Sequence, residues 1–148
     1  MAISFKSVGK TQQNVENETQ EKSPVPFGIK TPLRIGAKDG IFEMNYSLTD
    51  QFADNLRNLL LTNWGERLGL YRYGANLRSL VFLTQDEFDN QAIERIREAV
   101  EKWMPFIDLE NFSSETISDT GSVKINVTYN IPALNVQEQG IQVVISAI

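Results

Sequence analysis

The sequence predicts an α+β fold in which two main helices and a short one pack on a C-terminal antiparallel β-meander. Residues 47–63, and a second stretch from Asp89 or Asn90 to Met104, repeat apolar side chains at helical spacing. Beyond Pro105 the apolar period changes to two, which is typical of strands with one buried face. Helices followed by a run of strands, without βαβ alternation, indicate the α+β class.

The N-terminal residues 1–26 are predicted to form a mobile arm. The segment 9–21 is polar, with Val15 as its one aliphatic residue, so it buries too little apolar surface to offset the entropy of ordering. Two interpretations stay open: a frayed terminus without a role, and an arm that orders along a neighbouring molecule. We expect residues 27–148 to form a single domain, in which 27–45 contributes short extended pieces and a turn at 38–40.

Caps and breakers set the expected ends of the helices. The first helix begins at Ser47, where Ser47 and Asp50 come close to a capping box, and Gly65 stops it near Asn63. A short helix is expected over 75–83. Pro105 ends the second main helix, whose polar face offers Glu98 and Lys102 as an ion pair.

Three stretches of alternating residues predict the strands of the meander. They lie at 107–110, 122–131 and 141–148, and their apolar members define one buried face. Residues 119–121 mark the first turn, which precedes the central strand, and 132–140 is a longer connection to the last strand. The C-terminal strand is a natural edge strand.

Composition restricts the possible chemistry. The chain has 148 residues, no cysteine, no histidine and a net charge of −5. Thiolate or histidine metal sites and Ser-His-Asp catalysis are therefore excluded, and no cofactor is expected. The basic residues are too few and too scattered for binding nucleic acid, and no apolar run is long enough for a membrane span or a signal peptide.

The glycine-rich loop at 65–74 holds the best candidate residues. Glu66 could act as the general acid of a glycoside hydrolase, with Asp86 or Glu87 as its partner. The alternative, which we favour, is that Glu66 pairs with Arg67, Arg72 or Arg78 or caps a backbone turn. Similarly, Trp64, Tyr71 and Tyr73 suit either a stacking platform or, as we favour, a cluster packed under the loop, and arginines beside them suit a protein interface.

Four segments in this order resemble the GPW family of contractile-tail baseplate wedge proteins. They are Phe27-Gly28-Ile29-Lys30-Thr31-Pro32-Leu33, Asn58-Leu59-Leu60-Leu61-Thr62, Gly65-Glu66-Arg67 with Tyr73-Gly74, and Met104-Pro105-Phe106-Ile107. The family includes wedge subunits of phages and a type VI secretion baseplate component. The resemblance implies a non-enzymatic subunit of the virion tail baseplate, made in the host cytoplasm and present in multiple copies of a symmetric assembly.

The resemblance also implies partners and contact residues. Other baseplate wedge subunits and the tail sheath protein are the expected partners, and sheath assembly is expected to start by strand addition at the edge near Val143 and Ile145. Many members carry Glu-Pro-Arg where this chain has Met104-Pro105-Phe106, so either Phe106 packs into a partner or Glu66 and Arg67 supply the charged contact. The expected interaction residues are Glu66, Arg67, Arg72, Tyr73, Met104, Pro105, Phe106, Val143 and Ile145.

Two other classes remain as alternatives. Some members of the family have been described as tail lysozymes, which corresponds to the Glu66 hypothesis. A soluble binding module unrelated to tails is the third possibility.

Overall fold

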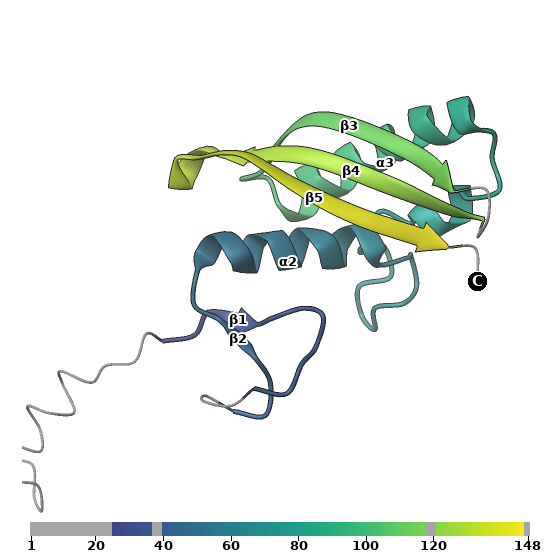
Figure 1. Cartoon of the computed structure of the whole chain (residues 1–148). Helices are drawn as coiled ribbons and strands as arrows, with labels where there is room; N and C mark the ends of the chain where they lie inside the picture. Colours follow the sequence, from purple (N-terminus) through teal and green to yellow (C-terminus); the bar gives the residue numbers. More distant parts are fainter. Residues whose placement is uncertain (1–24, 37–39, 118–120, 147–148) are drawn as a thin grey trace, which may run out of the picture. The chain divides into compact units, whose positions relative to one another are not determined.

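The computed structural model describes residues 25–36, 40–117 and 121–146 (Figure 1). The arm predicted over residues 1–26 lies outside the described residues except for its last two positions, as do parts of the turns at 38–40 and 119–121 and the last two residues. The chain divides into two compact units, Met1–Leu48 and Thr49–Ile148. The single domain predicted over 27–148 stays a prediction.

The described part of the first unit is a small antiparallel arrangement. Strand β1 (Gly28–Ile29) pairs with β2 (Met44–Asn45), and Ile35 bridges to Phe42 further along. Lys30 and Glu43 form an ion pair at 3.1 Å across it. These are the short extended pieces that the sequence predicts.

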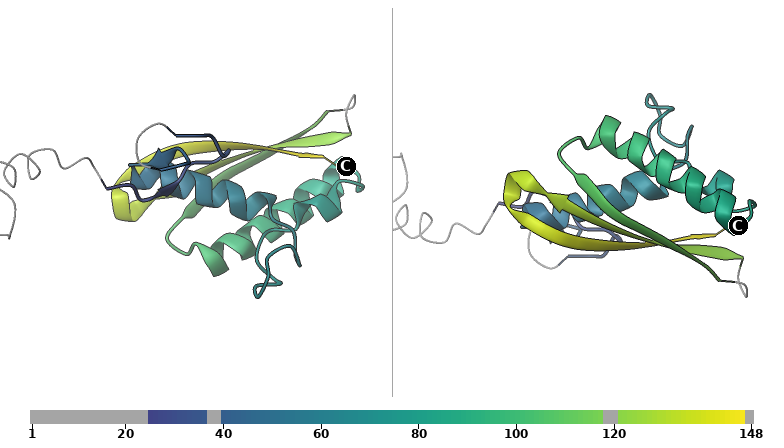
Figure 2. Two further views of the ribbon diagram at one scale, coloured as in Figure 1. Left: turned by 90° about the horizontal axis from the view of Figure 1, so that it is seen from below. Right: turned by 90° about the horizontal axis from the view of Figure 1, so that it is seen from above.

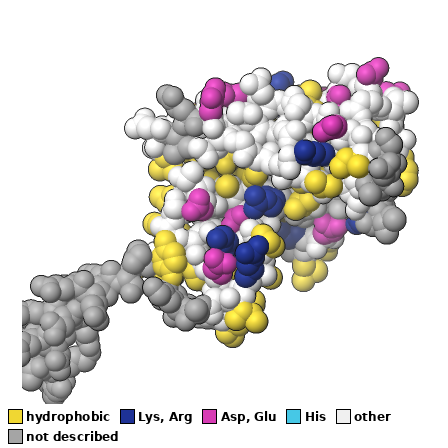
Figure 3. Space-filling view, viewed as in Figure 1, with side chains coloured by type: hydrophobic (Ala, Val, Ile, Leu, Met, Phe, Trp, Pro, Cys, Tyr) yellow, Lys and Arg dark blue, Asp and Glu magenta, His cyan; other side chains and the backbone are white. Residues whose placement is uncertain are grey.

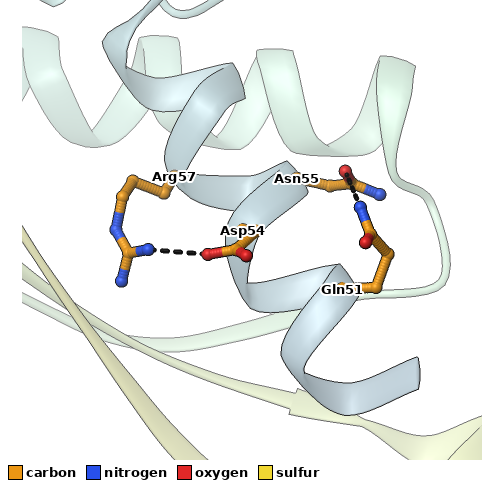
Figure 4. Close-up of polar contacts among 4 residues, drawn as sticks. All are labelled: Gln51, Asp54, Asn55 and Arg57. Atoms are coloured by element: carbon orange, nitrogen blue, oxygen red, sulfur yellow. Dashed lines mark hydrogen bonds and ion pairs between the residues drawn. The ribbon is translucent and has the colours of Figure 1, made fainter. Parts of the chain in front are cut away.

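Helix α2 spans Leu48–Leu61 and so begins directly after the predicted cap, Ser47. Two pairs of side chains stabilise its surface (Figure 4): Arg57 donates to Asp54 at 2.8 Å, and Gln51 donates to Asn55 at 2.9 Å. The helix ends at Leu61, before the predicted end at Asn63. The backbone N–H of Asn63 donates to the Glu66 carboxylate in the following loop and not to a helical carbonyl.

The expected short helix over 75–83 is a single 3-10 turn, η1 (Leu77–Leu80). Asn76 precedes this turn and has a left-handed backbone with φ 50°. An α-helix over 75–83 would include Asn76, so the expected helix cannot form with this backbone. The buried Leu77 and Leu80 anchor the turn in the core.

Helix α3 spans Gln85–Trp103 and starts about one turn before the predicted Asp89 or Asn90. Its first helical bond runs from the N–H of Phe88 to the carbonyl of Thr84 at 2.8 Å, and the Thr84 hydroxyl donates to Glu87 at 3.0 Å. Phe88 is buried and continues the apolar stripe toward the N-terminus. The ion pair predicted between Glu98 and Lys102 is not among those that the described residues form; Lys102 lies 5.2 Å from the ring centre of Trp103 instead.

The C-terminal part is the predicted antiparallel meander, in the order β3-β4-β5. The strands are β3 (Asp108–Ile117), β4 (Ser122–Ile131) and β5 (Val136–Ser146), with the turn η2 (Pro132–Leu134) between the last two. Val127 of β4 faces Phe112 on one side and Ile141 on the other. Two strands are longer than predicted: β3 continues through polar residues beyond 110, and β5 begins before 141.

Polar contacts with α3 explain the length of β3. Ser114 donates to Asp89, and Thr116 donates to Gln85, so the inward polar side chains of the strand have partners on the helix. The apolar alternation ends at Leu109, but the backbone pairing with β4 does not. Hydrophobic periodicity alone therefore underestimates this strand.

Both helices cover the same face of the sheet, giving two layers (Figure 2). The core lies between them and contains these buried residues of α2, α3, β4 and β5: Leu56, Leu59, Leu60, Phe88, Ala92, Ile96, Val100, Val123, Ile125, Val127, Tyr129, Ile131, Ile141, Val143 and Ile145. The outer face of the sheet is polar, with Gln142 donating to Asn126 at 2.9 Å. One face of each strand is therefore committed to the core.

Candidate protein-interaction site

The loop from Thr62 to Asn76 joins α2 to η1 and is fixed by its own backbone. The N–H of Gly65 donates to the Tyr71 carbonyl at 2.8 Å, and that of Ala75 donates to the Leu59 carbonyl at 3.2 Å. Gly74 has φ +102°, and an added Cβ would lie 2.1 Å from the Thr62 carbonyl oxygen. The loop therefore presents its side chains from an ordered scaffold.

Glu66 caps the turn that follows α2. Its carboxylate accepts from the backbone N–H of Asn63 at 2.7 Å and from the side-chain amide of Asn63 at 2.8 Å. These hydrogen bonds, side chain first and backbone second, hold the pKa of Glu66 below its ordinary value because they favour the charged form. This is the turn cap that we favoured from the sequence, and it is opposite to the raised pKa that a general acid needs.

Of the three aromatic residues of the loop, only Tyr73 packs against the core, and Trp64 is half-exposed. The guanidinium of Arg67 lies 4.3 Å from the ring centre of Tyr73, whose ring meets Trp103 edge-on at 5.2 Å. Tyr73 packs against the core, whereas Tyr71 is exposed. The cluster under the loop that we favoured is thus present for Tyr73, and Tyr71 lies outside it.

Two hollows meet at Glu66. The smaller, of about 220 Å³, joins the loop to the end of β5 and is lined by Leu60, Leu61, Asn63, Glu66, Arg78, Val144, Ile145 and Ser146. The larger and more open hollow, of about 500 Å³, is lined by Asn55, Asn58, Thr62, Glu66, Arg67 and Tyr73. Arg78 donates to the Ser146 carbonyl at 3.3 Å. The fold thus brings Glu66, Arg67, Tyr73 and the end of β5 into one region.

Strand β5 is an edge of the sheet, because in the described chain it pairs only with β4. The side chains of Val143 and Ile145 are buried in the core, at 3% and 6% exposure, while Val144 between them is 52% exposed. Contacts along this edge therefore involve mainly the backbone and outward side chains such as Val144, and Ile145 is reached only through the hollow at the end of the strand.

The junction between α3 and β3 forms a separate candidate surface. Met104 is buried, Pro105 is exposed, and Phe106 is 39% exposed. The ring of Phe106 lies 4.8 Å from that of Phe52 on α2. Part of the Phe106 ring thus packs on Phe52, and the rest is accessible to a partner.

Sequence reasoning missed a cationic cavity beside the loop. It has a volume of about 270 Å³ and is lined by Trp64, Arg72, Gly74, Arg95, Glu98, Ala99, Lys102 and Trp103. Of the predicted interaction residues only Arg72 lines it, together with Trp64 from the aromatic candidates. The lining residues come from the loop and from successive turns of α3. Their spacing in the sequence therefore does not indicate that they lie close together.

The described surface carries charges of both signs together with hydrophobic groups. Cationic and acidic side chains are intermixed on the described part of the face in Figure 3, with hydrophobic groups between them. Among the described residues no group of three or more acidic side chains is placed to hold a metal ion. No helix in the described ranges has the length and apolar content to span a bilayer.

These features define a small α+β subunit that offers a sheet edge, an ordered loop and an accessible aromatic ring, as in proteins that bind other proteins. The chain belongs to the baseplate wedge protein gp25 family, whose model matches residues 47–136. It is therefore a structural protein of a virion tail baseplate. No curated protein matches the chain significantly by sequence.

Two solved structures share the fold. One is a proposed tail lysozyme from Geobacter sulfurreducens, at 22% identity and a TM-score of 0.55, covering 67% of this chain and 88% of that chain. The other belongs to the baseplate of the anti-feeding prophage, at 18% identity and a TM-score of 0.52, covering 81% and 84%. At identities of 22% and 18%, the two similarities show a shared fold and nothing about function.

Proposed function

We propose that this chain binds larger wedge subunits in the baseplate and starts tail sheath assembly by strand addition at β5. The subunit is made in the host cytoplasm and enters a symmetric assembly in several copies, as the sixfold baseplate of the anti-feeding prophage suggests. The observation that carries the proposal is the edge of β5, which pairs with no strand other than β4 among the described residues. An edge strand offers a row of N–H and C=O groups to an extended segment of another chain.

The two edges of the sheet differ in ways that favour β5. Strand β3 carries Asp108, Glu110 and Glu115, and charged side chains on an edge discourage pairing. Strand β5 carries one charged residue, Glu138. The inward polar side chains of β3 are also bonded to α3. An incoming strand thus meets less charge at β5.

The hollow at the end of β5 provides a place for a side chain of the incoming strand. Leu60 and Leu61 form its apolar wall, and Glu66 and Arg78 supply polar groups. Pairing with backbone alone is tolerant of sequence, so a pocket of this kind adds selectivity.

Hydrogen exchange tests strand addition directly. Baseplates carrying this subunit are compared with and without the sheath protein, and exchange is followed in peptides covering 136–146 and 108–117. We expect slower exchange in β5 on addition of sheath, because outward N–H groups gain partners, and no change in β3, which is the matched edge within the same molecule. Unchanged exchange in β5 would contradict strand addition.

A deletion of the C-terminal strand would not test strand addition. Removing 141–148 would also remove Ile141, Val143 and Ile145 from the core, so a loss of assembly would only report unfolding.

A tail lysozyme is the second candidate, favoured only by the name of one structural relative. The lowered pKa of Glu66 leaves it ionised where a general acid must be protonated. We expect purified wild-type protein to release no sugar from peptidoglycan. Turnover that disappears in Glu66→Gln, with the fold retained, would establish the enzyme instead.

A further inference from the structure

The cationic cavity beside the loop is lined by other residues than the hollow at the end of β5 and does not include Phe106. Of its lining residues, Arg72, Arg95 and Lys102 are cationic and Glu98 is the one carboxylate. The whole chain carries a net charge of −5, so this local excess of positive charge does not follow from composition. Neither Arg72 nor Lys102 forms an ion pair within the described chain.

The walls of the cavity are held in place by contacts within the domain. Trp64 donates its indole N–H to the Gly74 carbonyl at 3.0 Å. Arg95 donates to the Asn76 carbonyl at 2.8 Å and to the Ser79 hydroxyl at 2.7 Å, and its guanidinium lies 5.4 Å from the ring centre of Trp64. A preorganised cation on an aromatic wall loses little entropy when an anion binds.

Trp103, which lines the cavity, has an indole N–H without a hydrogen-bond acceptor in the described chain. The indole nitrogen of Trp103 is buried and has no hydrogen-bond partner among the described residues. A buried donor without an acceptor is costly, and native structures rarely keep one without a reason.

From these observations we propose that the cavity binds an acidic segment of a partner protein, with a glutamate or aspartate carboxylate between the cations. Tryptophan and arginine are the residues that most often dominate protein interfaces. A nucleic acid is disfavoured, because the basic residues of the chain are too few and too scattered to neutralise a row of phosphates, whereas one or two carboxylates match the three cations of the cavity. The cavity volume of about 270 Å³ suits a side chain or two.

The chain offers a convenient reporter, because its two tryptophans, Trp64 and Trp103, both line the cavity. The probe is an acetylated, amidated hexaglutamate peptide with a fluorescent label, titrated with the full-length protein at low salt. Label anisotropy reports binding, and tryptophan emission in a parallel titration with unlabelled peptide reports its location. Hexaglutamine and a thymidine oligonucleotide are the comparison ligands.

Four variants separate the cavity from general charge effects. Arg72→Gln and Lys102→Gln should each weaken binding of hexaglutamate by about threefold, and Glu98→Gln should strengthen it by about threefold because a like charge is removed. Arg97→Gln is the matched control, since it removes an exposed cation of α3 that does not line the cavity. Opposite directions at neighbouring positions cannot arise from misfolding.

The outcome decides the proposal in either case. Binding of hexaglutamate with a change in tryptophan emission, and with the pattern of variants above, supports it. The proposal is overturned by absence of binding, by equal effects of Arg97→Gln and Lys102→Gln, or by tighter binding of the oligonucleotide.

Discussion

Glu66 shows how the partners of one carboxylate determine its role. The same residue in a glycine-rich, aromatic loop would serve as a general acid if it were desolvated, because burial favours the neutral form. Here it is exposed and accepts two hydrogen bonds from Asn63, which favour the charged form. Its role in the domain is to close the turn after α2.

This role predicts a dependence of stability on pH. The pKa of Glu66 is lower in the folded state than the ordinary 4.5. Its contribution to stability is therefore fully present above the unfolded pKa and is lost as pH falls through the folded pKa. The free energy of unfolding, measured with urea at neutral and at acid pH, should fall less on acidification in Glu66→Gln than in wild type.

Glu94→Gln is the control for that measurement, because it removes an exposed carboxylate of α3 that is not bonded to Asn63. We expect the free energy of unfolding of Glu94→Gln to fall on acidification by the same amount as that of wild type. Identical profiles for wild type and Glu66→Gln would contradict the capping role.

The pair Asp54 and Arg57 contributes to stability more than its place on a helix surface suggests. Asp54 is buried, with 8% of its side chain exposed, and Arg57 donates to it at 2.8 Å (Figure 4). A double-mutant cycle of Asp54→Ala and Arg57→Ala should give a coupling energy of about 0.5–1.5 kcal/mol in urea unfolding. The cycle isolates the pair from the other contacts of each residue.

Gln51 and Asn55 supply the matched comparison on the same helix. Their hydrogen bond of 2.9 Å joins neutral side chains. We expect a coupling of no more than about 0.5 kcal/mol for Gln51→Ala with Asn55→Ala. A larger coupling in this pair than in Asp54 with Arg57 would refute the argument from burial and charge.

At the scale of elements, the loop from Thr62 to Asn76 depends on the close approach of Gly74 to α2. Gly74→Ala places a Cβ against the Thr62 carbonyl oxygen and strains a backbone with φ +102°. We expect a loss of about 3 kcal/mol or more in unfolding free energy, because both strain and overlap contribute. The thermal midpoint should drop accordingly.

Gly69→Ala separates the two contributions. Gly69 also has a positive φ, +80°, but nothing lies within 4 Å of an added Cβ. We expect a loss of about 1 kcal/mol from strain alone. Equal losses in the two variants would show that the contact with Thr62 is unimportant.

Periodicity and breakers are enough to predict which elements exist, but not all of their ends. The meander and both helices follow from apolar spacing, whereas α3 begins at Gln85, directly after Thr84, and not at the predicted Asp89 or Asn90. In fact Thr84 and Glu87 have the spacing of a capping box, and that signal could have found the start. Strand β3 had no such signal, because its polar inward residues acquire partners only in the folded state.

The candidate site shows the same limit. Val143 and Ile145 are among the predicted interaction residues, although the alternation along β5 already indicates that their side chains face inward. Their burial leaves the backbone and Val144 as the main groups exposed along the edge. The turn cap of Glu66 could be proposed from its local sequence. The cavity around Trp64, Arg95 and Trp103 could not, because α3 and the loop come together only through tertiary packing.

At the scale of the whole molecule, an assembly protein must stay soluble alone and still bind when its partners are present. Its net charge of −5 disfavours self-association, and its accessible apolar groups include partly covered rings such as Phe106. A ring that packs on Phe52 and remains 39% exposed is already ordered before binding. Less entropy is then lost when a wedge subunit covers it.

Phe106→Glu should therefore prevent incorporation into wedges while leaving the subunit folded. A carboxylate in the centre of an interface costs several kcal/mol to desolvate, whereas in the free subunit it can turn toward water at a loss of about 1–2 kcal/mol of packing. Phe82→Glu is the control, because Phe82 is 83% exposed and lies away from the junction of α3 and β3. Wedge complexes reconstituted with each variant are separated by sedimentation and quantified by mass spectrometry. Retention of Phe106→Glu at the wild-type level, with Phe82→Glu lost, would move the docking surface from the junction to the segment between η1 and α3.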